Sequence, residues 1–366
     1  MIKGKATAEG TAAFAKNRPK AHERHWKNSL GFTLSSVGMG SYLGNADPIT
    51  DGKYAAAVGK ALEAGINVLD SAINYRYQRS ERNLGLGLKK AIAAGVVTRD
   101  QVLICTKGGF IAGDMGPPTK EWFEENYAKP GVATGADFVS GAHCMTPKYL
   151  RHEVEQSLKN FDVETIYVYY VHNPETQMPA VGPDEFYARL TAAFKELEAC
   201  VAEGKIQVYG AATWHAFRMP EGHDSHVSIE KTLACAEAAG GKNHHFKVIQ
   251  LPFNFGLPEA LSHLSQESGD ATVSALDAAR AAGLTVFTSV PLMQGQLLGR
   301  FGPDFKPKFP GLKTDAQRCL QFARSTPGVT APLCGMRTLE HVEENTAVCA
   351  AAPFTLDEFN ALIGRT

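Results

Sequence analysis

The sequence predicts a single (β/α)8 barrel that spans residues 1–366, with an N-terminal arm at 1–35 and a long insertion at 108–145. From Ser36 onward, short apolar runs alternate with amphipathic stretches rich in Ala, Leu, Glu and Lys. This alternation is typical of parallel strands joined by crossover helices, and each kind of segment occurs eight times. A length of 366 residues also suits one barrel that carries insertions.

The expected strands lie near residues 37–39, 66–69, 102–106, 166–171, 206–209, 248–250, 285–288 and 332–334. The expected helices lie at 53–64, 80–94, 147–160, 184–203, 228–239, 272–282, 315–325 and 338–351. Thr146-Pro147 is a good helix start, because Thr caps free N–H groups and Pro suits the first helical position. Four helices end at a glycine that can turn the chain into the next strand: Gly65, Gly95, Gly204 and Gly283.

Before the first strand, residues 1–31 show neither a repeat nor a strong hydrophobic period, so we interpret them as an arm. Residues 26–35 can form a hairpin around Gly31 that would cover the bottom of the barrel. His22 and His25 are three residues apart, but no cysteine or carboxylate pattern completes a metal site beside them. We therefore expect no metal and two surface histidines.

Composition restricts the kind of partner. The formal net charge is -1, from 37 basic and 38 acidic residues, which gives no general attraction for nucleic acid or anionic membranes. We expect a small-molecule partner, and the oligomeric state stays open. Seven cysteines, odd in number and without a C-x-x-C pair, indicate reduced thiols. With no apolar span and no secretory signal visible, we expect a cytoplasmic protein.

An open doubly wound sheet is the rival architecture, and its dinucleotide fingerprint is not met. The Gly-x-Gly at 38–40 follows a strand, but the third glycine would fall at Leu43. The Gly-x-Gly at 85–87 lies inside an expected helix. In a barrel, reactive groups instead gather at the carboxyl ends of the strands.

Polar side chains stand at three successive strand ends. Asp70 ends the second strand, Lys107 ends the third and His172 ends the fourth, so all three face one rim. Tyr75 follows Asp70 by five residues without helical periodicity, which places it in the next loop with its phenol free to reach back. Taken alone, each residue could instead have a purely structural role, such as a surface lysine or a hydrogen-bonded structural histidine.

Asp70-Ser71-Ala72, then Tyr75, then Ser80-Glu81 and Leu84-Gly85 together resemble the signature of the aldo-keto reductases. Asp70, Tyr75, Lys107 and His172 match the catalytic tetrad of that family residue by residue, and the resemblance runs from about Ser36 to Asn345. The resemblance implies an NAD(P)-dependent oxidoreductase that acts on an aldehyde, a ketone, or a sugar carbonyl or alcohol.

The chemistry explains these residue types. Hydride transfer to a carbonyl builds negative charge on oxygen, so a proton donor must lie within hydrogen-bond reach, and Tyr75 is the candidate. We expect the Lys107 ammonium to lower the pKa of this phenol and Asp70 to hold Lys107 in place. His172 would orient and polarise the carbonyl. The hydride must come from a nicotinamide, because no side chain delivers one.

The resemblance also suggests cofactor contacts. Gln250 matches the residue that binds the carboxamide, and Glu344-Asn345 match the pair that holds the adenine. The stretch 291–299 resembles the loop that wraps the pyrophosphate, from which we select Pro291, Leu292, Gln294 and Gln296.

Some positions depart from the family pattern. Ala212-Thr213 replace a common Ser-Asn, so Thr213 is the remaining carboxamide contact, and Ser289 replaces a stacking aromatic. Arg337 and His341 stand where the family often binds the 2′-phosphate. We therefore favour NADP(H) and keep NAD(H) as a possibility.

The insertion at 108–145 is far longer than an ordinary barrel loop and carries several aromatic residues. It leaves directly after Lys107, so we expect a lid over the catalytic rim, with an oligomer contact as the alternative. Tyr42, Trp122, His143 and Trp214 are the expected lining of the substrate pocket.

Two other functions stay open. One is a nicotinamide-binding sensor or auxiliary subunit with little turnover. The other is a barrel lyase or isomerase that uses Tyr75 and Lys107 without a nicotinamide, against which Gln250 and Glu344-Asn345 argue.

Overall fold

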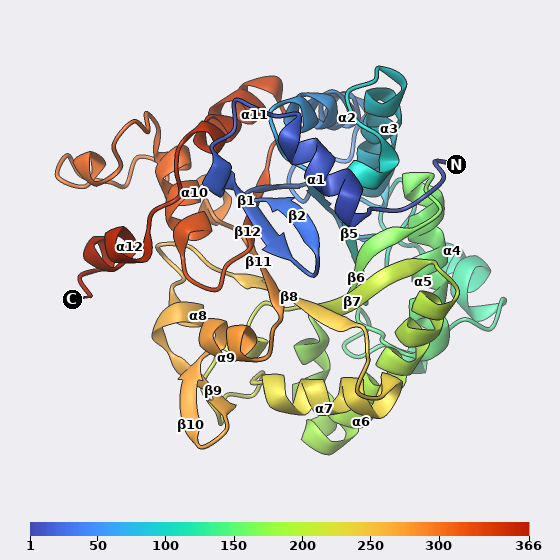
Figure 1. The fold of residues 1–366 in the computed structure, drawn as a ribbon. Helices are drawn as coiled ribbons and strands as arrows, with labels where there is room; N and C mark the ends of the chain where they lie inside the picture. The colour runs from blue at the N-terminus through green and yellow to red at the C-terminus, as the bar shows by residue number, and fades with distance from the viewer. Residues whose placement is uncertain (366) are drawn as a thin grey trace.

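A closed barrel of parallel strands forms the centre of the molecule, which was described over residues 1–365 from a computed structural model (Figure 1). The strands follow one another around the barrel in the order β11-β12-β3-β4-β5-β6-β7-β8. They are β3 (Gly38–Gly40), β4 (Val68–Asp70), β5 (Leu103–Gly108), β6 (Ile166–His172), β7 (Ile206–Ala212), β8 (Phe246–Pro252), β11 (Thr285–Ser289) and β12 (Ala331–Gly335). All eight expected barrel strands are present, so the predicted (β/α)8 class is confirmed.

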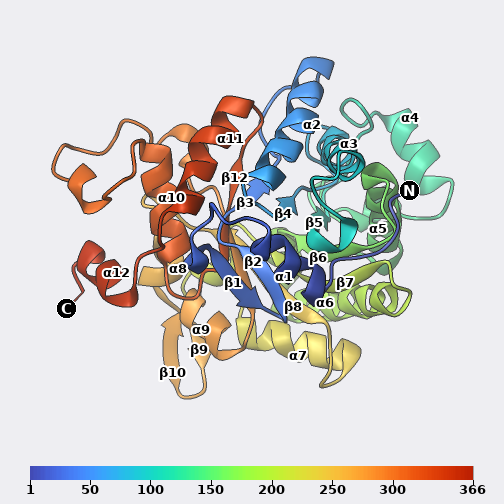
Figure 2. The same cartoon turned by 45° about the horizontal axis from the view of Figure 1, so that its top comes forward.

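Helices surround the barrel on its outside in both views (Figures 1 and 2). They are α2 (Pro48–Glu63), α3 (Arg79–Ala93), α5 (Pro147–Phe161), α6 (Met178–Ala202), α7 (Ile229–Gly240), α9 (Ala275–Ala281), α10 (Asp315–Ser325) and α11 (Leu339–Thr346). Helix α6 begins six residues earlier than expected, because the chain is already helical before a kink at Gly182, where φ is 76°. Gly65, Gly95, Gly204 and Gly283 all have positive φ, as their position before a strand predicts.

Apolar side chains pack on both faces of the barrel strands. Val68, Leu103, Val248 and Phe287 are completely buried inside the barrel, whereas a larger cluster packs between the strands and the helices. Burial on both faces explains why the strands are almost continuous apolar runs. Polar side chains at strand ends therefore stand out against this background.

The N-terminal hairpin consists of β1 (Trp26–Ser29) and β2 (Phe32–Ser35), joined at Gly31 as expected. It lies across the amino-terminal end of the barrel, in front of the strands in Figure 1. Phe32 packs edge-on against Tyr167 of β6, and the Ser35 N–H donates to the side chain of Asn67 over 2.8 Å. The hairpin thus closes the end of the barrel opposite the strand ends that carry Asp70 and His172.

Three features of the arm and the helical layer differ from the sequence-based predictions. Residues Ala8–Lys16 form helix α1, whose cap Thr7 accepts from the Gly10 N–H. Thr272 belongs to a hairpin of β9 (Leu264–Ser268) and β10 (Ala271–Ser274), and the helix starts only at Ala275. His25 is buried, and both of its ring nitrogens are hydrogen-bonded, Nε2 to the Gly65 carbonyl and Nδ1 to the Ser36 hydroxyl. The expectation of a surface histidine was wrong for His25.

The insertion at 108–145 has an apolar core of its own. It contains α4 (Lys120–Phe123), which lies at the edge of the molecule in Figures 1 and 2, and a π-helical turn at Glu124–Ala128. Tyr127 and Phe138 pack on Tyr149 of α5, and the Tyr127 hydroxyl donates to Glu153 over 3.0 Å. The aromatic residues of the insertion therefore anchor it against the outside of α5.

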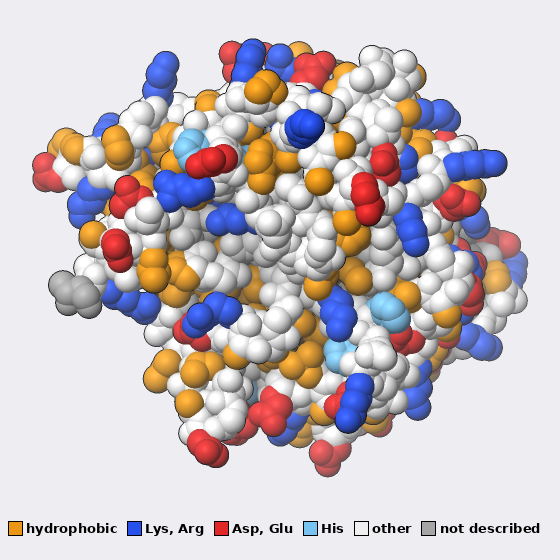
Figure 3. All heavy atoms as spheres, viewed as in Figure 1, with side chains coloured by type: hydrophobic (Ala, Val, Ile, Leu, Met, Phe, Trp, Pro, Cys, Tyr) orange, Lys and Arg blue, Asp and Glu red, His pale blue; other side chains and the backbone are white. Residues whose placement is uncertain are grey.

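Short helices α8 (Glu259–Ser262) and α12 (Leu356–Ile363) complete the fold. Basic and acidic side chains are interspersed over the face seen in Figure 3. Within residues 1–365, no helix is both long and apolar enough to cross a membrane.

Candidate active site

Three neighbouring parallel strands bring the predicted polar residues to one rim. Asp70 is the last residue of β4, Lys107 is the penultimate residue of β5 and His172 is the last residue of β6. The strands β4, β5 and β6 are paired in this order, with Asp70 beside Cys105 and Lys107 beside Tyr170. The shared direction of the strands therefore places the three side chains together, as expected.

Asp70 and Lys107 form a buried ion pair. Lys107 Nζ lies 2.6 Å from Asp70 Oδ1 and donates also to the Ser71 carbonyl over 2.6 Å. The other oxygen of Asp70 accepts from the Gln250 amide over 3.0 Å. This network fixes the ammonium, since each alternative position would leave a charge unpaired in a dry environment.

Tyr75 lies over this pair. Lys107 Nζ is 5.1 Å from the centre of the Tyr75 ring, and His172 contacts the same ring edge-on at 5.8 Å between centres. Tyr42 also packs edge-on against the Tyr75 ring, at 4.9 Å between centres. The phenol, the ammonium and the imidazole thus meet in one small volume.

Burial dominates the acid–base properties of these groups. Burial raises the pKa of Tyr75, and the nearby Lys107 ammonium only opposes this rise. The predicted direction of the Lys107 contribution is confirmed, but burial outweighs it, so the pKa of Tyr75 is raised. For Lys107, burial lowers the pKa, but Asp70 and Tyr75 together outweigh it, so the pKa is raised and the side chain stays charged.

His172 is a neutral imidazole in this environment. Burial lowers its pKa well below the ordinary value, and the charges of Lys107 and His143 act in the same direction. Its carbonyl accepts from His143 Nε2 over 2.7 Å, while its own Nδ1 is buried without a partner among the described residues. A neutral histidine can donate one hydrogen bond to an oxygen without competing for its proton.

A cavity of about 490 Å³ opens above these groups. The predicted residues that line it are Tyr42, Asp70, Tyr75, His172, Thr213, Trp214, Gln250, Pro291, Leu292 and Gln294. Lys107 lies beneath this lining, almost completely buried. The cavity therefore brings together the reactive groups and the first part of the expected cofactor contacts.

The remaining predicted cofactor residues are not part of the cavity lining, although that lining includes Cys334 of β12. His341 is exposed, Asn345 is buried with its Nδ2 directed to Cys334, and the Glu344 carbonyl accepts from Gln317. Arg337 is half-buried beside Gly44, and Gln296 is exposed in the loop after β11. Asn345 therefore contacts the cavity lining through Cys334.

Two predicted pocket residues were placed wrongly. Trp122 packs edge-on against Tyr127 at 5.1 Å in the core of the insertion, outside the cavity lining. His143 is completely buried behind His172 and cannot touch a ligand in the cavity. Of residues 108–145, Phe110 alone is part of the cavity lining, so neither Trp122 nor His143 contributes to it.

Sequence reasoning also missed cavity residues. Phe110 contacts the His172 ring at 5.1 Å between centres, and Asn173 and Val290, with backbone φ of 45° and 51°, also line the cavity. An aromatic residue three positions after Lys107, and an Asn directly after His172, were the available signals. Among residues 1–365, no group of three or more His, Cys, Asp or Glu side chains could hold a metal ion.

Comparisons with known proteins identify relatives of this chain. The chain is 27% identical over 194 residues to an NADH-specific methylglyoxal reductase of Escherichia coli, covering 52% of this chain and 51% of that enzyme. The chain thus spans about half the length of this relative. It is 22% identical over 343 residues to an L-galactose dehydrogenase of Arabidopsis thaliana, covering 87% and 85%.

Solved structures share the fold. An aldo/keto reductase from Klebsiella pneumoniae, crystallised with NADP and acetate, matches with a TM-score of 0.61 at 17% identity, covering 93% of this chain and 94% of that one. The model of the Aldo/keto reductase family matches residues 36–227, more than half of the chain, and this range contains all four residues of the Asp-Tyr-Lys-His cluster. The chain therefore belongs to the aldo/keto reductase family.

Proposed function

We propose that this protein is an NAD(P)-dependent oxidoreductase that transfers a hydride between a nicotinamide cofactor and an aldehyde, ketone, or sugar carbonyl or alcohol. The observation that carries the proposal is the position of Tyr75, half-buried at the cavity above the Lys107–Asp70 pair and beside a neutral His172. These groups suit a reaction in which an oxygen gains negative charge and then a proton.

The proposed roles follow from the geometry. Tyr75 donates its proton to the oxygen of the substrate during reduction and receives it back during oxidation. Lys107 limits the rise of the phenol pKa that burial causes, and Asp70 keeps the ammonium in place. His172 donates a hydrogen bond to the same oxygen and so orients the carbonyl.

The residues present fit a nicotinamide dinucleotide. Gln250 and Thr213 line the cavity, and the Gln250 amide N–H is already directed to Asp70, which leaves its amide oxygen for a carboxamide. The loop after β11 lines the cavity next to them through Pro291, Leu292 and Gln294. When bound, the cofactor would supply the hydride that no side chain can provide.

We propose NADP(H) as the favoured cofactor, with NAD(H) as the alternative. Arg337 is a half-buried cation beyond the cavity, where it can bind a 2′-phosphate, and His341, Glu344, Asn345 and Gln296 are the other proposed contacts. One relative is named as NADH-specific and one structural neighbour contains NADP, so relatives support both cofactors.

For the substrate we propose a small carbonyl compound or alcohol, placed between Tyr42 and Trp214 at the cavity mouth. We also propose a cytoplasmic location, supported by seven cysteines that are all unpaired and buried.

Tryptophan fluorescence and nicotinamide absorbance test the proposal together. Trp214 lines the cavity and is partly exposed, so NADPH or NADH should quench its emission. A screen of carbonyls, alcohols and sugars should then show turnover that Tyr75→Phe removes, with cofactor affinity kept within about threefold because the phenol acts on the substrate. Binding without turnover of any compound would favour the sensor. Turnover without a nicotinamide would favour a lyase or isomerase.

A further inference from the structure

The chain directly after Tyr75 has an unusual backbone. Three consecutive residues, none of them glycine, adopt the left-handed conformation: Arg76 with φ 50°, Tyr77 with φ 57° and Gln78 with φ 67°. Side chains with a Cβ rarely adopt this conformation, and it persists only where the surroundings determine it. Contacts with neighbouring segments must therefore hold this turn in place.

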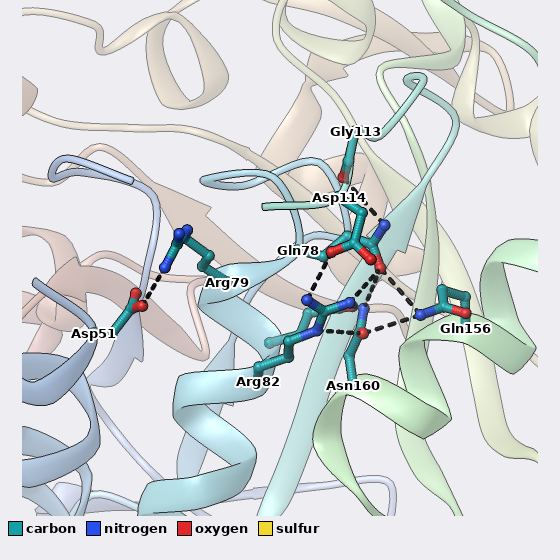
Figure 4. A network of polar contacts seen from close by, with 9 residues as sticks. Asp51, Gln78, Arg79, Arg82, Gly113, Asp114, Gln156 and Asn160 are labelled. Carbon is teal, nitrogen blue, oxygen red and sulfur yellow. Dashed lines mark hydrogen bonds and ion pairs between the residues drawn. The ribbon is translucent and has the colours of Figure 1, made fainter. Parts of the chain in front are cut away.

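Gln78 is the centre of these contacts. Its side chain is buried, its Nε2 donates to the Gly113 carbonyl over 3.1 Å, and its Oε1 accepts from Asn160 over 3.0 Å and from Gln156 over 3.1 Å. Figure 4 shows Gln78 between Gly113 of the insertion and the two amides of α5. One side chain thus connects the turn after Tyr75 to two separate parts of the fold.

The insertion supplies further contacts to the same turn. The Met115 N–H donates to the Tyr77 carbonyl over 3.2 Å, and Arg82 Nη1 lies 2.7 Å from Asp114 (Figure 4). A Cβ on Gly113 would lie 2.0 Å from the Gly116 carbonyl oxygen, so only glycine permits the tight bend that presents the Gly113 carbonyl. Residues 113–115 therefore bind the turn after Tyr75 through both backbone and side-chain contacts.

A second anchor holds the other end of the turn. The Arg76 side chain is buried, with Nε donating to the Asn45 carbonyl over 2.9 Å and Nη2 lying 2.6 Å from Asp51. Arg79 pairs with the other oxygen of Asp51 (Figure 4). This anchor connects the turn to α2 and to the loop before it.

The turn transmits its position to Tyr75 through short backbone contacts. The Gln78 N–H donates to the Ile73 carbonyl over 3.1 Å, and the Tyr75 N–H donates to the Ala72 carbonyl over 3.0 Å. The Ile73 N–H in turn donates to the Lys107 carbonyl over 3.1 Å. A shift of the turn would therefore move the Tyr75 ring relative to Lys107.

We propose that Gln78 is a positioning residue for Tyr75, and that residues 113–115 of the insertion serve as the fixed point against which Gln78 holds the turn. This inference rests on the proposed function, in which Tyr75 exchanges the proton. It gives the insertion a role in holding the reactive loop, outside the cavity itself.

Gln78→Gly tests the proposal, and Tyr77→Gly is its matched control. Both changes introduce a glycine at a left-handed position of one turn, but only the first removes the side chain that binds Gly113, Gln156 and Asn160. Because glycine adopts this conformation readily, neither variant should lower the melting temperature through backbone strain.

The expected result separates rate from binding. Gln78→Gly should lower kcat by about tenfold or more, with KM and the cofactor Kd within about threefold, because misplacement of a reacting group affects the chemical step. The phenol-dependent limb of its pH profile should shift as well, since the distance from Tyr75 to Lys107 changes. Tyr77→Gly should keep both kcat and the pH profile.

Hydrogen exchange of the peptide that contains residues 72–80 provides a readout without turnover. Exchange should be faster in Gln78→Gly than in Tyr77→Gly and the unaltered protein, and this result would stand even if no substrate were turned over. Equal effects of the two glycine variants on kcat and exchange would overturn the proposal, because backbone flexibility alone would then explain them. A Gln78→Gly variant with unaltered kcat and exchange would overturn it too.

Discussion

Lys107→Met is the most informative substitution, because methionine replaces the apolar stem of the side chain and removes only the ammonium. In the structure this ammonium contacts Asp70 Oδ1 and the Ser71 carbonyl, each at 2.6 Å. The side chains of Lys107 and Asp70 are 1% and 6% exposed, so water cannot replace the lost contacts. The variant therefore leaves a carboxylate unpaired in the interior.

The cost to stability can be estimated from this burial. Removing one partner of a buried ion pair typically costs about 3–5 kcal/mol, and we expect the free energy of unfolding to fall by this amount. Asp70 can relieve part of the cost by taking up a proton, since burial already raises its pKa and Lys107 no longer opposes the rise. Lys107→Met with Asp70→Asn removes the unpaired charge and should recover most of the stability without recovering turnover.

Activity gives the second readout. Lys107 opposes the increase of the Tyr75 pKa that burial causes, so its loss raises the pKa further. The limb of the pH profile that depends on the phenol should move to higher pH, and the rate at neutral pH should fall by about a hundredfold or more. Urea unfolding and initial rates from pH 5 to 10 measure both effects. A variant with a normal rate and an unaltered pH profile would refute the pairing of Lys107 with Tyr75.

Three further predictions concern the cofactor and pH. Arg337→Ala should raise the Kd of NADPH by about tenfold or more and that of NADH less, because a charge-assisted bond is lost; equal effects would mean that Arg337 serves packing only. Burial lowers the pKa of His143 from 6.5 to about 4. The contribution of the neutral His143 to the free energy of unfolding is therefore complete above pH 6.5 and is lost as the pH falls through 4. Between pH 6.5 and pH 4, the free energy of unfolding measured with urea should fall by roughly 3 kcal/mol less in His143→Gln than in the unaltered protein. An equal fall in the two proteins would contradict this prediction. Burial raises the pKa of Glu175 to about 7, and this carboxylate accepts from the backbone N–H of Trp214 over 2.6 Å. Trp214 emission should therefore titrate near pH 7 in the unaltered protein but not in Glu175→Gln, and a titration in both would exclude Glu175 as its cause.

Much of the fold was predictable because the barrel strands are buried on both faces. An apolar run can be recognised in the sequence without knowing which strand it pairs with. Each expected strand therefore overlaps an observed one. The hairpin of β9 and β10 was missed because its strands are polar and depend on distant contacts. Gln266 of β9 donates to the Phe217 and Val227 carbonyls and accepts from the Ile229 N–H. Sequence periodicity carries no trace of such bonds.

The site divides in the same way. Asp70, Lys107 and His172 could be placed from sequence, since each stands at a strand end and parallel strands share an edge. The pKa of Tyr75 could not, because the balance between burial and the Lys107 charge depends on the depth of the cavity. Trp122 was misplaced because an aromatic residue in a long loop fits a separate small core as well as a pocket.

The insertion shows why anchoring and closure make opposite demands on a segment. A lid must open, so it has to be drawn from the least stable part of a fold and make few buried contacts. Here Tyr127 and Cys144 are almost completely buried, Tyr127 is bonded to Glu153, and Gly113 and Met115 are bonded to the turn after Tyr75. Opening would break these contacts together, which makes the segment a poor gate. The same contacts make the segment suited to hold the turn after Tyr75 in place. A fixed turn keeps the phenol of Tyr75 close to the Lys107 ammonium, which the proton transfer requires.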